Sequence, residues 1–99
     1  MTAIQIHPQA KVEFEAEITN YENARRGWGA LLREDVLSTI RQIAAFPRLG
    51  RPASLGSRRF VTPRFLFLVH YELTADHILI IAISHPSREP GYGQSRRAP

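Results

Sequence analysis

The spacing of apolar residues changes twice along this chain, and each spacing predicts a different kind of element. Residues 4–6 alternate apolar, polar and apolar before a His-Pro pair, which is typical of a short strand. Residues 8–26 and 30–45 instead repeat apolar positions every three or four residues, as amphipathic helices do. The two apolar stripes are Phe14, Ile18 and Tyr21 in the first segment and Leu32, Val36, Ile40 and Ile43 in the second.

Proline and glycine mark where these helices begin and end. Pro8 suits a first helical turn, where its missing N–H is not needed. Gly27 and Gly29 interrupt the helical pattern, and Pro47 disfavours helical geometry in the residue before it. Residues 47–57 contain two prolines and two glycines, so we predict a loop there.

Three strand-like runs follow, over residues 59–62, 65–73 and 77–84, with a short hairpin connection at 74–76. Both faces of the 65–73 run begin apolar, which favours a central position in the sheet. The last run contains an unbroken apolar stretch at 78–83, and burying each large side chain there contributes roughly 1.5–3 kcal/mol. We expect this last hairpin to be the centre of stability.

The predicted order is therefore strand, helix, helix, strand, strand, strand. Such a chain buries its apolar stripes by packing a two-helix hairpin on one face of a mainly antiparallel four-stranded sheet, which is an α+β architecture. With 99 residues there is room for a single domain over 1–99, and we expect 93–99 to be a flexible tail.

The amino-acid composition limits the cellular location and the chemistry that we expect for this domain. The chain has no cysteine, which excludes disulfides, thiolate metal sites and cysteine nucleophiles, and fits a reducing compartment. No apolar run approaches the roughly 20 residues that a membrane span needs. The first residues do not show a basic segment followed by an apolar one. We expect a cytoplasmic protein that needs no cofactor and no membrane.

Charge is distributed unevenly along the chain. Residues 8–46 carry five basic and six acidic side chains, whereas residues 47–99 carry eight basic and three acidic ones. The basic residues are twelve arginines and one lysine, Lys11. Arginine grips phosphates or carboxylates with two hydrogen bonds, so an arginine-rich half indicates an anionic partner. The arginine excess over lysine also has a simpler explanation, a GC-rich source genome.

Three features of residues 46–92 resemble the ParE/RelE toxin superfamily of type II toxin–antitoxin, or plasmid stabilisation, systems. The first is the Phe-Pro pair at 46–47 followed by Gly-Arg-Pro at 50–52. The second is an aromatic-rich strand that ends Val-His-Tyr-Glu at 69–72. The third is a last strand that runs directly into a basic turn, over 80–92.

This resemblance implies a toxin neutralised by an antitoxin whose C-terminal segment wraps its surface, with operator DNA bound only through the antitoxin. ParE-like members poison DNA gyrase, and RelE-like members cleave mRNA on the ribosome. RelE-like enzymes usually carry an arginine three residues before the tyrosine of the central strand, and here that position is Leu68. We therefore favour a growth-inhibiting gyrase toxin without chemistry of its own. An mRNA endonuclease and an inactive partner-binding module remain as alternatives.

The gyrase-toxin and endonuclease hypotheses each point to candidate residues. Residues expected to bind the target or the antitoxin are Arg58, Arg59, Arg64, Arg88, Tyr92 and Trp28. If the chain is a ribonuclease, the expected catalytic residues are His85, Arg88, Tyr92 and Arg64.

Each candidate also has a purely structural reading. Arg88 can pair with Glu89, and His85 can hydrogen-bond backbone at the end of a strand. Tyr92 can anchor the C-terminal segment, and Trp28 can close the end of the helical hairpin. The arginines at 58, 59 and 64 can serve as edge charges that discourage pairing between sheets.

The histidines at 70, 77 and 85 do not predict a metal site. Strand alternation places His70 on the opposite face from Val69 and Tyr71, and no pair has a familiar ligand spacing.

Overall fold

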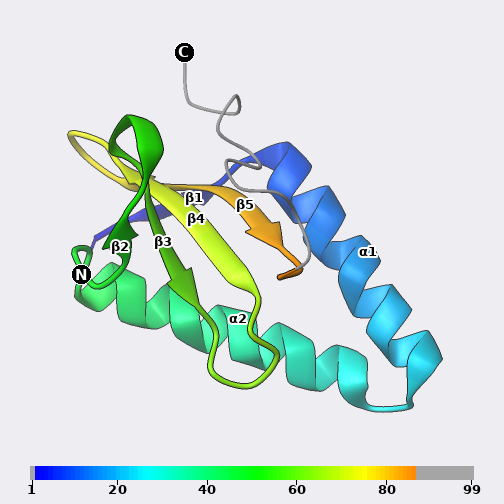
Figure 1. Ribbon diagram of the computed structural model, residues 1–99. Helices are drawn as coiled ribbons and strands as arrows, with labels where there is room; N and C mark the ends of the chain where they lie inside the picture. Colours follow the sequence, from blue (N-terminus) through cyan, green and yellow to red (C-terminus); the bar gives the residue numbers. More distant parts are fainter. Residues whose placement is uncertain (1, 87–99) are drawn as a thin grey trace.

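The computed structural model describes residues 2–86, which form two helices and one mixed sheet (Figure 1). The elements in chain order are β1 (Ile4–Ile6), α1 (Pro8–Ala24), α2 (Trp28–Ala45), β2 (Arg51–Pro52), the 3-10 turn η1 (Ser54–Gly56), β3 (Arg58–Val61), β4 (Leu68–Leu73) and β5 (Ile78–Ser84). The predicted α+β fold with a two-helix hairpin is confirmed.

The sheet has the order β1-β5-β4-β3-β2, with β1 parallel to β5 and all other pairs antiparallel. β4 lies in the middle, as the apolar residues on both of its faces predict. The sheet has five strands instead of the predicted four, because residues 51–52, expected to be loop, pair with the start of β3. A strand this short has no alternation to detect, and its proline is tolerated because β2 is an edge strand.

Several element boundaries differ from the sequence prediction: α2 begins at Trp28 instead of residue 30, β3 is displaced by one residue, β5 begins one residue later, and the ends of α1 and β4 differ for a clear reason. α1 ends at Ala24, before the expected end at residue 26, because Arg25 is extended with φ −157°. Residues 65–67 were expected to open a strand but form part of the turn between β3 and β4. Leu66 has φ +60° and therefore cannot continue a strand, so β4 begins at Leu68.

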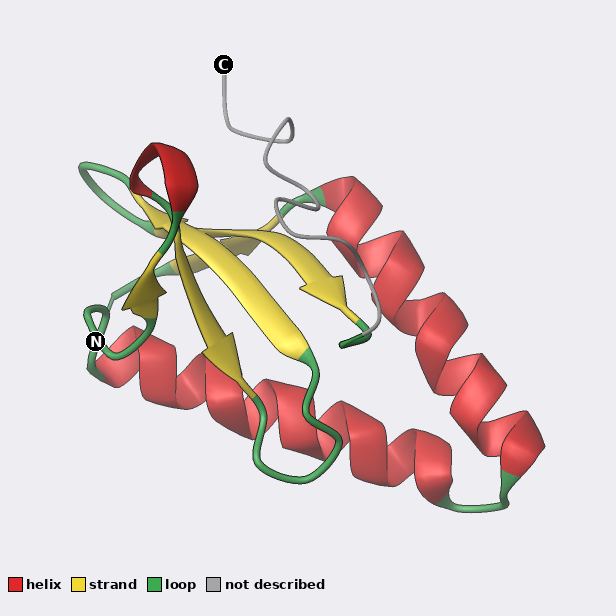
Figure 2. Cartoon of the chain, in the orientation of Figure 1, coloured by secondary structure: helices red, strands yellow, loops and turns green. Residues whose placement is uncertain are grey.

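The core lies between the helices and one face of the sheet. Figure 2 shows the two helices diverging from their shared turn, and in this view the sheet is seen across the opening of the V that they form. The whole predicted stripe of α2 is buried, and all seven residues of β5 are buried. α1 buries only Ala10 and Phe14, which explains its weaker apolar pattern. Within residues 2–86, neither helix is both apolar and long enough to cross a membrane.

Candidate functional site

β3 has an open edge. β4 pairs with all four residues of β3, whereas β2 pairs only with Arg58 and Arg59. The N–H of Thr62 donates to Phe67 in the β4 direction. Alternation along an antiparallel strand therefore directs the N–H and C=O of Val61 away from β4, to the side that β2 does not reach. Backbone groups at such an edge are available to another strand.

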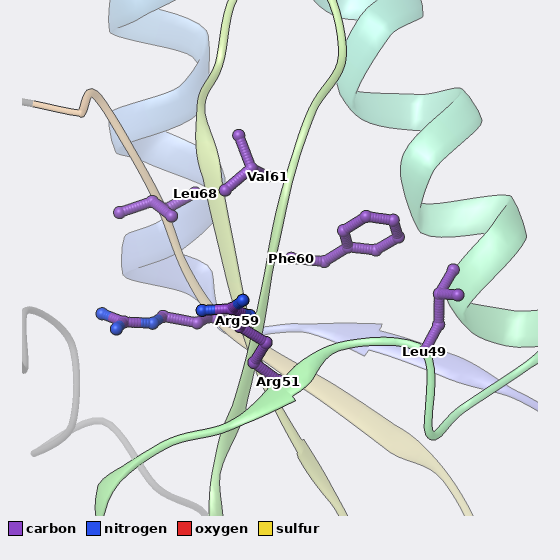
Figure 3. A pocket seen from close by; sticks show the side chains of 6 residues that line it. All are labelled: Leu49, Arg51, Arg59, Phe60, Val61 and Leu68. Atoms are coloured by element: carbon purple, nitrogen blue, oxygen red, sulfur yellow. The ribbon is translucent and has the colours of Figure 1, made fainter.

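A groove of about 450 Å³ lies beside this open edge (Figure 3), and its lining residues are Leu49, Arg51, Arg59, Phe60, Val61 and Leu68. Leu49 and Val61 are both more than two-fifths exposed. Figure 3 shows Phe60 and Leu49 on the side of β3 that faces α2 and Arg59 on the opposite side, so the groove wraps around the strand edge. The surface is apolar with a cationic border.

Two of the arginines in the groove form a like-charge pair. Arg51 and Arg59 are directly opposite each other in the β2–β3 ladder, and both are exposed. Like charges in this arrangement destabilise a sheet unless an anion lies between them. On its other side Arg59 is opposite His70, whose pKa is lowered by burial and by the Arg59 cation. This cation density attracts carboxylates.

Buried and partly buried hydrogen bonds hold the wall of the groove in place. The Gly50 N–H donates to the Tyr71 hydroxyl at 2.8 Å, and that hydroxyl donates to the Pro47 carbonyl at 2.8 Å. Arg58 Nη1 donates to the Gly50 carbonyl at 2.8 Å, so part of the Arg58 guanidinium is used inside the protein. Sequence reasoning grouped Arg58 with Arg59, but neighbours in a strand face opposite sides of the sheet.

A second feature is the turn at residues 62–67, which is anchored at both ends. The buried Asp35 carboxylate of α2 accepts from Arg64 N at 3.2 Å and from Phe65 N at 2.8 Å. Thr62 closes the turn, because its Oγ1 accepts from Phe67 N at 3.0 Å and its own N–H donates to Phe67 O at 2.8 Å. These bonds hold Leu66 in a left-handed conformation that costs a leucine about 1–2 kcal/mol.

The same turn packs on the tip of the helical hairpin through aromatic rings. The Phe65 ring meets Tyr21 edge to face at 5.3 Å and Trp28 at 6.1 Å between centroids. The Arg25 guanidinium lies 5.3 Å from the Trp28 ring centroid. Trp28 is the first residue of α2. Together with Tyr21 and Phe65 it forms an aromatic cluster that joins the helices to the β3–β4 turn.

His85 follows β5, and its ring packs edge to face on Phe67 at 5.6 Å. It lines a small polar pocket of about 160 Å³, together with Glu13, Glu17 and Asn20 of α1. The remaining candidates, Arg88 and Tyr92, lie outside the described residues. The structure thus brings Arg64 and Trp28 to one end of the molecule and places Arg59 in the groove.

Among residues 2–86, no three histidine or acidic side chains are close enough together to hold a metal ion. His70 instead lies beside Ser84, with its Nε2 3.1 Å from Ser84 Oγ, and both residues are buried.

Sequence reasoning missed the role of four residues that shape these surfaces. Arg51 was placed in a loop, and Leu68 was noted only as a missing arginine. Asp35 gave a usable signal, because it is a carboxylate within the apolar stripe of α2, between Leu32 and Val36. The positive φ of Leu66 had no signal, since leucine rarely adopts it.

Comparison with known proteins agrees with this architecture. The family model described as the ParE toxin of the type II toxin–antitoxin system parDE matches residues 4–90. None of the curated proteins matches the chain. A solved structure titled as a chromosomal ParDE TA system from P. aeruginosa has a similar fold, with a TM-score of 0.75 and 19% identity. That match covers 86% of this chain and 96% of the other. The chain therefore belongs to the ParE toxin family of type II toxin–antitoxin systems.

Proposed function

We propose that this chain is a toxin that arrests growth by binding and poisoning DNA gyrase, without chemistry of its own, and that an antitoxin neutralises it. The observation that carries the proposal is Leu68 in the groove wall, at the position where RelE-like ribonucleases usually carry an arginine. Its neighbours Val61 and Phe60 are also apolar, so this part of the sheet favours binding over proton transfer.

The groove is the proposed antitoxin site. The open edge at Val61 offers backbone hydrogen bonds to an added strand, and alternate side chains of that strand can reach the apolar lining. Arg51 and Arg59 favour a segment that carries carboxylates. The proposed occupant is therefore an extended antitoxin segment with apolar and acidic residues in alternation.

A supercoiling assay tests the action on gyrase. Purified chain is added to DNA gyrase and relaxed plasmid, and the products are examined for lost supercoiling and trapped cleavage complexes. We expect both effects, and we expect an equimolar amount of the cognate antitoxin to abolish them. Unaffected gyrase, with a chain that still arrests growth, would contradict the proposal.

Variants in the groove test the antitoxin site separately. Val61→Glu introduces a carboxylate beside Arg59 and removes an apolar contact, so neutralisation should weaken by at least about tenfold. The matched control is Val12→Glu, because Val12 is exposed on α1 and lies outside the groove. If the antitoxin neutralises both variants equally well, the groove is not the antitoxin site.

The polar pocket beside His85 favours a second candidate function, a ribosome-dependent mRNA endonuclease that uses His85, Arg88, Tyr92 and Arg64. Primer extension on cellular mRNA after induction separates the two functions. Discrete cuts favour the endonuclease, whereas intact message together with a DNA-damage response favours gyrase. Normal growth despite a folded chain would instead indicate an inactive partner-binding module.

A further inference from the structure

The turn between β3 and β4 presents a leucine at the tip of the molecule. Leu66 is 55% exposed, although the two residues before it are held in place, Arg64 and Phe65 by backbone hydrogen bonds to the Asp35 carboxylate and Phe65 also by its ring contact with Tyr21. A leucine at φ +60° is disfavoured, and Gly or Asn would fit this backbone better. Strain of this kind is retained where the surrounding structure enforces it, and it is frequent at binding sites.

Exposed basic side chains lie in the same part of the molecule as Leu66. Arg64 adjoins it in the turn, and Arg25 and Arg26 lie at the end of the helical hairpin, all three exposed. The acidic residues of this region have hydrogen-bond partners inside the protein, and Asp35 accepts from the backbone of the turn itself. Glu22 accepts hydrogen bonds from the Gly27 and Gly29 N–H groups, and Glu34 pairs with Arg41 at 2.8 Å. The tip therefore combines an apolar projection with a surplus of guanidinium groups.

We infer that the tip formed by Trp28, Arg64, Phe65 and Leu66 is the surface that docks on the toxin's macromolecular target. The target site that fits it is a protein surface with an apolar pocket for Leu66 and a rim of carboxylates for the arginines. Trp, Tyr and Arg are the residues that most often dominate protein–protein binding energy, and here Tyr21 and Trp28 pack on Phe65, the residue just before the exposed Leu66. The inference rests on the proposed toxin function, but it does not require the target to be gyrase.

The chain contains its own matched control. Leu55, in η1, is also left-handed at φ 60° and is 73% exposed. It precedes β3, whereas Leu66 follows it, so the two leucines are at opposite ends of that strand. Replacing either by asparagine removes the apolar side chain and eases the backbone strain, so both variants should fold at least as well as the wild type.

The test expresses Leu66→Asn and Leu55→Asn without antitoxin and measures growth arrest, with circular dichroism and thermal unfolding as checks on folding. Leu66→Asn should need at least about tenfold more protein for the same arrest, whereas Leu55→Asn should match the wild type. Arg64→Gln should weaken arrest in the same direction, against Arg48→Gln as its control. Both leucine variants arresting growth equally would overturn the inference.

Binding assays separate the inference from the proposed function. If the wild-type chain arrests growth but leaves purified gyrase active, the gyrase proposal fails. The growth arrest caused by Leu66→Asn and by Leu55→Asn still tests the tip. If gyrase is inhibited equally by both leucine variants, the proposed function stands and the tip is rejected. If the chain binds duplex DNA alone in a salt-sensitive way and Leu66→Asn loses this binding, the tip binds nucleic acid. That result would overturn the inference that the tip docks on a protein. A wild-type chain that causes no arrest overturns both.

Discussion

The backbone of Gly50 lies directly against the ring of Tyr71, and a hydrogen bond joins them. The Tyr71 hydroxyl is 2.8 Å from Gly50 N, and a methyl group added at Gly50 would lie 2.6 Å from that hydroxyl oxygen. The contact connects the middle of the sheet to the segment that carries Leu49 and Arg51, so the shape of the proposed antitoxin groove depends on it.

Removing the hydroxyl should destabilise the fold. In Tyr71→Phe the Gly50 N–H and the Pro47 carbonyl lose their partner in a buried place, which should lower the free energy of unfolding by about 1–3 kcal/mol. Urea denaturation measures this. Tyr21→Phe is the control, because within residues 2–86 the Tyr21 ring makes aromatic contacts while its hydroxyl makes no hydrogen bond, and the stability of this variant should change by less than about 0.5 kcal/mol.

The Asp35 carboxylate should be necessary for the β3–β4 turn. Asp35→Ala leaves the N–H groups of Arg64 and Phe65 without their acceptor, and we expect a loss of about 1.5–3 kcal/mol. Asp35→Asn keeps one acceptor oxygen and should lose less. Glu34→Gln, which breaks an exposed ion pair on the same helix, should cost no more than about 1 kcal/mol. Equal losses for Asp35→Ala and Glu34→Gln would contradict this role.

His70 should make stability depend on pH. Burial, and then the Arg59 cation, lower its pKa in the folded protein, so the unfolded chain binds a proton more readily. The stability that neutral His70 permits is complete above its unfolded pKa of about 6.5 and decreases as pH falls from there toward the folded pKa. Urea midpoints between about pH 8 and pH 5 should show this decrease in wild type and a smaller one in His70→Gln. Parallel pH curves for the two proteins would exclude His70 as the cause.

Gly29 allows the two helices to approach closely. A Cβ there would lie 2.9 Å from the Ile18 carbonyl oxygen and 3.0 Å from the Glu22 Cβ. In a helix, alanine is more favourable than glycine by about 1 kcal/mol. The Ile18 carbonyl, however, is part of the α1 backbone and cannot easily move away from an added Cβ. We therefore expect Gly29→Ala to lose about 1–3 kcal/mol in thermal or urea unfolding. Asn23→Ala, at an exposed site on α1, should be neutral or slightly stabilising, and a stabilised Gly29→Ala would refute the close contact.

Some of this protein was determined by local sequence alone. The helical stripe of Leu32, Val36, Ile40 and Ile43 and the apolar run of β5 are repeated patterns over many residues, so they predicted the helices, the last hairpin and the α+β fold. Repetition makes such signals strong, because each buried side chain adds independently to the same choice of element.

Tertiary structure alone decided the features that depend on a single distant partner. The pairing of Arg51 with Arg59 creates the fifth strand, which stops short of Val61 and leaves its edge open, and two residues leave no periodic trace in the sequence. The left-handed Leu66 is likewise imposed from outside its own segment, by a carboxylate on α2 and by rings at the helical tip. A local preference of about 1–2 kcal/mol is outweighed when several such contacts act together, so the proposed binding surfaces arise where local sequence gave the weakest indication.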